Sequence, residues 1–280
     1  MNVQQALQLA REQVEENGQI STLEAQVLLA EILGHNRSVV LAHPELELNS
    51  NQQLRFRTDL EQVRSGVPLA FLLGWKDFYG RRFDVTHETL IPRPETEQLV
   101  ERALEILRGR EHPRVVDVGT GTGCIAITIA CEYERASLLA TDRSPGPLKV
   151  AKRNAVKHAV SGQLQWLLAD LLSPIRGRFD LLCANLPYIP SERLRSLAVS
   201  EHEPVAALDG GQEGMDYTAR LIRQLPDILA PNGTALFEID QGQGDPLGAI
   251  ARTYLPGCNV HIEQDAAGLE RLLLIEGSAK

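Results

Sequence analysis

From residue 114 onwards, short apolar segments of strand character alternate with segments of helical periodicity. This alternation constrains the fold more than any other feature of the sequence. The predicted strands are 114–118, 137–141, 164–168, 179–184, 234–239, 259–263 and 271–275. Strands that alternate with helices usually pair in parallel and are covered on both faces. The last two are joined only by QDAAGLE, which indicates a hairpin with one antiparallel strand. We therefore predict an α/β fold with a seven-stranded, mostly parallel sheet.

The first 75 residues have a different pattern, which is helical throughout. Apolar residues recur with a period near 3.6 from the start of the chain. A second helix is predicted to begin at Ser21, which forms a capping-box pattern with Glu24, and to end at Gly34. A third is predicted over 50–65. This region therefore predicts a small helical bundle, for which the docking of a substrate protein and simple structural support are both open roles.

Residues 76–94 separate this bundle from the rest of the chain. Phe78 and Phe83 flank a Tyr79-Gly80 turn, which is typical of a short hairpin. The prolines of the IPRPETE stretch that follows prevent a helix before Glu95. A length of 280 residues is also typical of about two domains. The predicted organisation is a helical docking domain over 1–75, a hairpin linker over 76–94 and an α/β domain over 95–280.

The charge of the chain bears on its partners. The 28 Lys and Arg residues against 37 Asp and Glu residues give a formal net charge of −9, and aromatic residues make up 5% of the sequence. Proteins that grip the nucleic-acid backbone need a surface rich in Lys and Arg, and base-stacking platforms need aromatic side chains. The composition therefore disfavours direct binding of nucleic acid.

Targeting, membrane and metal signals are absent from the sequence. No apolar run approaches the roughly 18–20 residues that a membrane span needs. The first residues lack the basic-then-apolar order of a signal peptide, so we expect a cytoplasmic protein. The four cysteines form no CxxC pair and the seven histidines are scattered, so no metal site is predicted.

The richest motif is DVGTGTG, which lies between a predicted strand and a predicted helix. Glycine tolerates positive φ and lets a ligand approach the backbone at the start of a helix. The candidate binding residues of this turn are Gly119, Thr120, Gly121, Thr122 and Gly123. The spacing Gly121-x-Gly123-x-x-Ala126 also satisfies the dinucleotide fingerprint. Asp117 favours another ligand: its carboxylate would repel a pyrophosphate but suit S-adenosylmethionine, a cation without phosphates. The alternative is that Asp117 only caps the turn.

Two further acids follow the next two predicted strands. Asp142 ends one strand, where a carboxylate can accept hydrogen bonds from both ribose hydroxyls; this feature fits a nicotinamide cofactor equally well. Asp170 follows the next strand, at the sheet edge where an adenine ring would lie, and Leu171 beside it could pack on the ring face. The alternative is that Asp170 and Leu171 belong to a loop without ligand contacts.

A tetrapeptide, Asn185, Leu186, Pro187 and Tyr188, directly follows the fourth predicted strand. It therefore shares the carboxyl edge of the sheet with the glycine turn. The carboxamide oxygen of Asn185 and a neighbouring backbone carbonyl can accept both hydrogens of a planar NH₂ group, while an aromatic ring covers its flat face. The lone pair of such a nitrogen is delocalised, so the nitrogen is a poor nucleophile. Two acceptors favour its pyramidal geometry and stabilise the positive charge that develops as it is methylated.

Together these motifs resemble class I S-adenosylmethionine-dependent methyltransferases, which have a Rossmann-like fold, that modify planar NH₂ groups. The resemblance extends over nearly the whole chain to one family, the bacterial peptide chain release factor glutamine methyltransferases. The motifs that carry it are FYGRRF, LIPRPETE, DVGTGTG, TDRS, NLPYI, EPVAALDGGQEGMD and FEIDQGQ, in this order.

The resemblance implies methylation of the side-chain nitrogen N5 of the glutamine in the GGQ motif of release factors, which act in translation termination. It further implies that Gly119–Gly123, Asp142, Leu171 and Asn185 contact S-adenosylmethionine. Asn185–Tyr188 would hold the glutamine, and the N-terminal bundle would help to dock the release factor.

The chain departs from the family pattern at two positions. The usual tetrapeptide is Asn-Pro-Pro-Tyr, and Leu186 replaces the first proline. The backbone carbonyl needed as acceptor is retained, although the fixed φ of proline is lost; Pro187 still biases Leu186 towards an extended conformation. At Leu171, where some members carry an aromatic residue, weaker packing on the adenine is expected.

Several alternatives remain open from the sequence. An N6-adenine DNA or RNA methyltransferase would use the same tetrapeptide, but it would need to expose a base and bind phosphates. A glutamine methyltransferase acting on a ribosomal protein would use the same core. A nicotinamide-dependent oxidoreductase would leave the tetrapeptide without a purpose, and a non-catalytic binding module would not need the full set of side chains.

Overall fold

The computed structural model describes residues 1–17, 21–173 and 175–278. The chain forms two compact units, Met1–Trp75 and Lys76–Lys280. Within the described ranges, no helix combines the length and the apolar character that crossing a bilayer requires.

The first unit is helical, as the periodicity predicts. Its helices are α1 (Val3–Asn17), α2 (Thr22–Leu33), α3 (Arg37–Ala42), α4 (Ser50–Arg64) and α5 (Leu69–Leu73). The capping box of Ser21 and Glu24 is formed, and Gly34 ends α2 in the left-handed conformation with φ +67°. Leu29 of α2 and Phe56 of α4 are fully buried in the core of this unit. The predicted helical bundle is confirmed.

The second unit begins with the predicted hairpin. Strands β1 (Trp75–Phe78) and β2 (Arg81–Asp84) pair through a turn in which both Tyr79 and Gly80 have positive φ, 51° and 67°. Two consecutive left-handed residues are typical of a tight hairpin turn. The N–H of Tyr79 donates a hydrogen bond to Glu97 Oε1 at 2.8 Å, which holds the residue in this conformation.

The main sheet has seven strands: β3 (Arg114–Val118), β4 (Ser137–Asp142), β5 (Leu164–Leu168), β6 (Phe179–Ala184), β7 (Leu229–Glu238), β8 (Asn259–Gln264) and β9 (Glu270–Glu276). Their order is β5-β4-β3-β6-β7-β9-β8. The first five strands pair in parallel, and β9 runs antiparallel to both of its neighbours. The predicted mostly parallel, Rossmann-like sheet with a C-terminal hairpin is confirmed.

One strand boundary differs from the prediction by more than one residue. β7 begins at Leu229, whereas the sequence pattern starts it at Thr234. Leu229 pairs with Phe179 and Thr234 pairs with Leu181, so the register shifts between these two pairs. The Pro-Asn-Gly stretch between these pairs is typical of a loop, so the sequence pattern did not predict a strand there. In the structure this stretch forms an irregularity inside β7.

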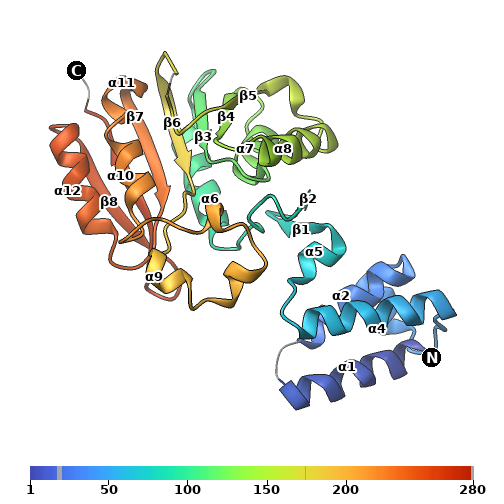
Figure 1. Ribbon diagram of the computed structural model, residues 1–280. Coiled ribbons are helices and arrows are strands. Elements are labelled where there is room, and N and C mark those ends of the chain that lie inside the picture. Colours follow the sequence, from blue (N-terminus) through green and yellow to red (C-terminus); the bar gives the residue numbers. More distant parts are fainter. Residues whose placement is uncertain (18–20, 174, 279–280) are drawn as a thin grey trace. The chain divides into compact units, whose positions relative to one another are not determined.

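Helices cover both faces of the sheet (Figure 1). One face carries α6 (Thr96–Leu107), α7 (Cys124–Glu132) and α8 (Pro145–Lys157); the other carries α10 (Asp216–Ile222), α11 (Leu225–Ile228) and α12 (Gly244–Tyr254). The neighbours Leu181 and Leu182 of β6 are both fully buried, and each packs into the core of a different face. This is why the central strands read as continuous apolar runs.

The strand order also creates the crevice for a site. The chain moves outwards from β3 to β4 and β5, and then returns to place β6 on the opposite side of β3. Ligands of open parallel sheets bind at the carboxyl ends of the strands beside such a reversal. The glycine turn follows β3 and the asparagine tetrapeptide follows β6, so the topology places the two motifs next to each other.

Candidate active site

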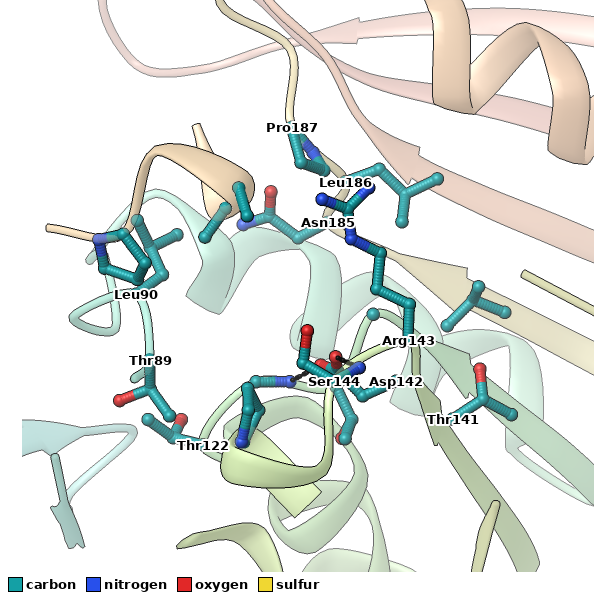
Figure 2. Close-up of a pocket in the computed structure, with 18 of the residues that line it drawn as sticks. Thr89, Leu90, Thr122, Thr141, Asp142, Arg143, Ser144, Asn185, Leu186 and Pro187 are labelled. Carbon is teal, nitrogen blue, oxygen red and sulfur yellow. Dashed lines mark hydrogen bonds between the residues drawn. The ribbon is translucent and has the colours of Figure 1, made fainter. Parts of the chain in front are cut away.

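A cavity lies at the carboxyl ends of the parallel strands (Figure 2). It encloses about 1090 Å³ of space free of protein atoms, part of which is continuous with solvent. The predicted site residues that line it are Gly119, Thr120, Gly121, Thr122, Asp142, Asp170, Leu171, Asn185, Leu186 and Pro187. Three predicted residues, Asp117, Gly123 and Tyr188, are not among the lining residues.

The glycines of the turn are needed for two reasons. Gly119 and Gly123 have φ of +75° and +82°, a region that other residues rarely adopt. A Cβ on Gly119 would lie 2.9 Å from Leu186 Cδ2, and a Cβ on Gly123 would lie 2.7 Å from Ile127 Cδ1. Gly119 therefore allows the tetrapeptide to approach the turn, whereas Gly123 has a packing role at the start of α7.

The backbone of the turn is largely satisfied by the protein itself. The N–H groups of Gly119 and Thr120 both donate to the carbonyl of Thr141, at 2.9 and 2.8 Å. The N–H of Gly121 donates to Asp142 Oδ2 at 3.1 Å. A phosphate-binding turn would instead direct such N–H groups at its anion. This arrangement argues against a dinucleotide cofactor.

Asp142 provides the carboxylate of the cavity wall. Its Oδ1 accepts a hydrogen bond from the N–H of Ser144 at 2.9 Å, and burial raises the pKa of the carboxyl. Each carboxylate oxygen can accept more than one hydrogen bond. Asp142 therefore keeps acceptor capacity for two ribose hydroxyls.

Asp117 lies behind the glycine turn. Its carboxyl is fully buried, and Oδ2 accepts a hydrogen bond from the hydroxyl of Thr120 at 2.6 Å. Within the described ranges, Oδ1 has no hydrogen-bond partner. Burial raises the pKa of this carboxyl to about 7. This position favours the alternative in which Asp117 holds the turn from behind.

The adenine end of the predicted site includes residues that the sequence did not identify. Asp170 Oδ2 accepts a hydrogen bond from Arg220 Nη2 at 2.5 Å, so its charge is paired. Tyr217 lines the cavity, and its hydroxyl accepts a hydrogen bond from Arg143 Nη1 at 2.6 Å. The guanidinium of Arg143 also lies 5.2 Å from the centre of the Tyr217 ring. Leu171 is buried beside them, with a φ of 54°.

Asn185 has a defined orientation in the wall of the cavity. Its Nδ2 donates to Glu238 Oε2 at 2.8 Å and to Thr96 Oγ1 at 3.0 Å. The amide nitrogen therefore faces two acceptors inside the protein. The atom left for a ligand is the carbonyl oxygen Oδ1, which is the acceptor that the predicted chemistry requires.

Glu238 and Thr96 are site residues that sequence reasoning missed. Glu238 ends β7 and is 1% exposed; its Oε2 also accepts the hydroxyl of Thr96 at 2.7 Å. The hydroxyl of Tyr188 donates to the other oxygen, Oε1, at 3.3 Å. Burial raises the pKa of Glu238. The sequence signal that could have identified Glu238 is its place in the FEIDQGQ motif, where an acidic residue ends a strongly apolar strand.

A second buried acid, Glu203, holds in place a segment of the chain that lines the cavity. Glu203 Oε1 accepts a hydrogen bond from Arg93 Nη2 at 2.5 Å, and Oε2 accepts one from the N–H of Ile91 at 3.0 Å. Residues directly after Glu203, Pro204, Ala206 and Ala207, line the cavity. The IPRPETE stretch therefore anchors the segment that closes one side of the site.

Within the described part of the chain, no group of three or more His, Cys, Asp or Glu side chains is arranged to hold a metal ion. Acidic side chains outnumber basic ones in the lining of the cavity. Its lining acids are Glu88, Asp142 and Asp170, and its two arginines, Arg93 and Arg143, bond to Glu203 and Tyr217. The lining therefore suits a cationic ligand better than an anionic one.

Two family models match the chain. The model described as the PrmC N-terminal domain matches residues 5–74. The model described as the methyltransferase small domain matches residues 96–201, which include the glycine turn and the asparagine tetrapeptide.

Individual proteins match over most of the chain. The sequence is 34% identical to the release factor glutamine methyltransferase of Bacillus cereus, over 99% of both chains. It is 38% identical to the protein of the same name from Moorella thermoacetica, over 90% of both chains. Among solved structures, a methyltransferase from Pyrococcus furiosus aligns with 82% of this chain and 100% of its own, with a TM-score of 0.53 and 15% identity. This last likeness concerns the fold alone.

Proposed function

The chain belongs to the release factor glutamine methyltransferase family, and we propose that its cavity methylates the glutamine of the GGQ motif in peptide chain release factors. The protein is an S-adenosylmethionine-dependent protein-(glutamine-N5) methyltransferase. The single observation that carries the proposed site is the orientation of Asn185, whose Nδ2 donates to Thr96 and Glu238 inside the protein and so leaves Oδ1 as the acceptor for a ligand.

The residues of the cavity fit this cofactor. When bound, S-adenosylmethionine supplies an electrophilic methyl group on a positively charged sulfur. Gly119–Thr122 would border the amino-acid part, Asp142 would accept the ribose hydroxyls, and Asp170 and Leu171 would border the adenine. The internally bonded N–H groups of the turn suit a ligand without phosphates.

The acceptor side of the site acts on the amide nitrogen. Asn185 Oδ1 and the backbone carbonyl of Leu186 would accept its two hydrogens and hold it in line with the methyl group. As the carbon–nitrogen bond forms, positive charge develops on the nitrogen, and two acceptors stabilise it. The proton on the methylated nitrogen becomes acidic and can leave to water, so no dedicated base is needed.

The departure at Leu186 is compatible with this role. Its side chain is buried and extends over Gly119, which has no side chain in its way. Its backbone carbonyl is retained whatever the side chain. Tyr188 is assigned a supporting role through its bond to Glu238, because it is not among the lining residues.

The substrate class favours release factors over the alternatives. The relatives that match over most of the chain are named for release factors, which disfavours an adenine methyltransferase and a glutamine methyltransferase of a ribosomal protein. The net charge of −9 supports a protein acceptor without direct contact to nucleic acid. An acceptor that works in translation termination implies a cytoplasmic enzyme.

We assign the docking of the release factor to residues 1–75, with 76–94 as linker and 95–280 as the catalytic domain. The support is the match of residues 5–74 to the family model described as the PrmC N-terminal domain, which covers nearly all of this helical unit.

The test is methyl transfer from labelled S-adenosylmethionine to a purified release factor. Replacing the glutamine of the GGQ motif by alanine should abolish the labelling of the release factor. Replacing a glutamine elsewhere in the same release factor should leave the labelling unchanged. Label that persists on the GGQ variant would refute the acceptor assignment. Label on added RNA or DNA would instead support the adenine alternative.

A further inference from the structure

Behind Asn185, on the side away from the cavity, lies a buried carboxylate that the proposed reaction does not itself use. Glu238 is 1% exposed and is not among the residues that line the cavity. It accepts hydrogen bonds from Thr96, Asn185 and Tyr188, which come from three different parts of the chain. A buried charge is retained at a considerable desolvation cost, so its function calls for an explanation.

We propose that Glu238 is a positioning residue that fixes and polarises the Asn185 carboxamide for the methyl acceptor. This inference rests on the proposed acceptor role of Asn185. It adds to that role the residue that decides which way the carboxamide faces.

The hydrogen bonds form a closed triangle. The Thr96 hydroxyl has one hydrogen, which it donates to Glu238 Oε2, so it presents a lone pair to Asn185 Nδ2. Glu238 Oε2 also accepts from Nδ2. With the amide of Asn185 reversed, Oδ1 would face two oxygens that offer no further hydrogen. The acceptor-only character of an ionised carboxylate therefore permits a single amide orientation.

The same carboxylate strengthens the acceptor. A carboxylate that accepts a hydrogen bond from an amide N–H polarises the amide and increases the electron density on its carbonyl oxygen, because linked hydrogen bonds polarise one another. Positive charge that develops on the substrate nitrogen then meets a stronger acceptor. Arg271 and Glu95 are the other charges that act on Glu238, and Arg271 pairs with Asp265 at 2.9 Å.

The shape of the side chain can be separated from its charge. Glu238→Gln keeps the size of the side chain but replaces one carboxylate oxygen by an NH₂ group. Because the NH₂ group only donates, the side chain can no longer accept hydrogen bonds from all three of its donors. Thr96→Val removes one corner of the triangle, with its two hydrogen bonds, and leaves the carboxylate in place. Asp180→Asn is the matched control: Asp180 accepts a backbone N–H from Arg114 at 2.8 Å at the amino end of β6, away from the cavity.

The experiment measures methyl transfer in single turnovers with saturating cofactor and release factor, alongside cofactor affinity by calorimetry and the melting temperature. We expect Glu238→Gln to lower the rate about 10- to 100-fold, Thr96→Val to lower it less, and both to leave the cofactor Kd within about twofold. Asp180→Asn should leave the rate unchanged.

A double-mutant cycle separates positioning from a merely structural role. If Glu238 acts through Asn185, Glu238→Gln should slow the Asn185→Ala enzyme by less than about twofold, because residues that act as a unit are not additive. Multiplied effects in the double variant, or a wild-type rate in folded Glu238→Gln, would overturn the inference. A wild-type rate in Asn185→Ala would instead refute the proposed acceptor role of Asn185.

Discussion

Gly119 and Leu186 meet at the centre of the site: a Cβ on Gly119 would lie 2.9 Å from Leu186 Cδ2. Gly119 belongs to the turn after β3, and Leu186 belongs to the tetrapeptide after β6. The contact joins the cofactor half of the proposed site to the acceptor half. A change on either side should therefore affect both.

Gly119→Ala should impair cofactor binding and methyl transfer together. The new methyl group would push against Leu186, and the φ of +75° would add strain of about 1 kcal/mol. We expect the cofactor Kd from calorimetry to rise at least about tenfold. Gly109→Ala is the control, since Gly109 has a φ of +77° but no atom within 4 Å of its Cβ. Leu186→Ala should partly restore binding in the Gly119→Ala enzyme; no restoration would show that the contact does not matter.

Asp142→Asn should weaken cofactor binding with little effect on the rate at saturation. The carboxylate accepts the N–H groups of Gly121 and Ser144, and an amide would oppose one of these donors with its own NH₂. A loss of about 10- to 100-fold in affinity is expected for one charged hydrogen-bonding group. Titration calorimetry measures it, with Asp180→Asn as the acid-to-amide control. An unchanged Kd would exclude Asp142 from the ribose site.

Stability should depend on pH through Asp117. Its pKa is about 7 in the folded protein against 3.8 for the unperturbed carboxyl, so between these values the folded state holds a proton that the unfolded state has lost. The stabilising contribution is therefore complete below pH 3.8 and is lost as the pH rises through 7. Asp117→Asn removes this loss. Its free energy of unfolding relative to wild type should increase by up to about 1.4 kcal/mol per pH unit over this window.

Urea unfolding at several pH values in the folded range, without cofactor, measures that difference. Asp265→Asn is the control, because the bond to Arg271 lowers the pKa of Asp265, so this carboxyl stays ionised throughout the tested range and its difference from wild type should not change with pH. A difference between Asp117→Asn and wild type that stays constant from pH 5 to 8 would contradict the prediction.

Arg93→Ala should destabilise the protein more than the double variant Arg93→Ala/Glu203→Gln. The single change leaves the nearly fully buried Glu203 carboxylate without its guanidinium partner, at a cost of about 3–5 kcal/mol. Glutamine is neutral and can still accept the N–H of Ile91. Chemical denaturation gives the two values. Equal stability of the single and double variants would show that the buried charge is not the cause.

The sequence predicted the fold almost completely, because local signals carry it. Strands β3, β5 and β6 begin and end where the apolar runs do, and Ser21 and Gly34 delimit α2 through caps that involve only near neighbours. The order of motifs along these elements also predicted which residues share the carboxyl edge of the sheet. Such features depend on periodicity and backbone conformation, which neighbouring residues determine.

Only the tertiary structure decided which residues far apart in the chain form hydrogen bonds with each other. Thr96 and Glu238 are 142 residues apart in the chain, and Ile91 and Glu203 are 112 apart. No periodicity indicates such pairs, because they arise from the order of strands and the packing of α6 over the sheet. The same packing placed Asp117 behind the turn and directed Tyr188 to Glu238. Local sequence thus determined which elements form and which edge carries the chemistry, and the packing of distant elements determined which atoms of Asn185 face the cavity.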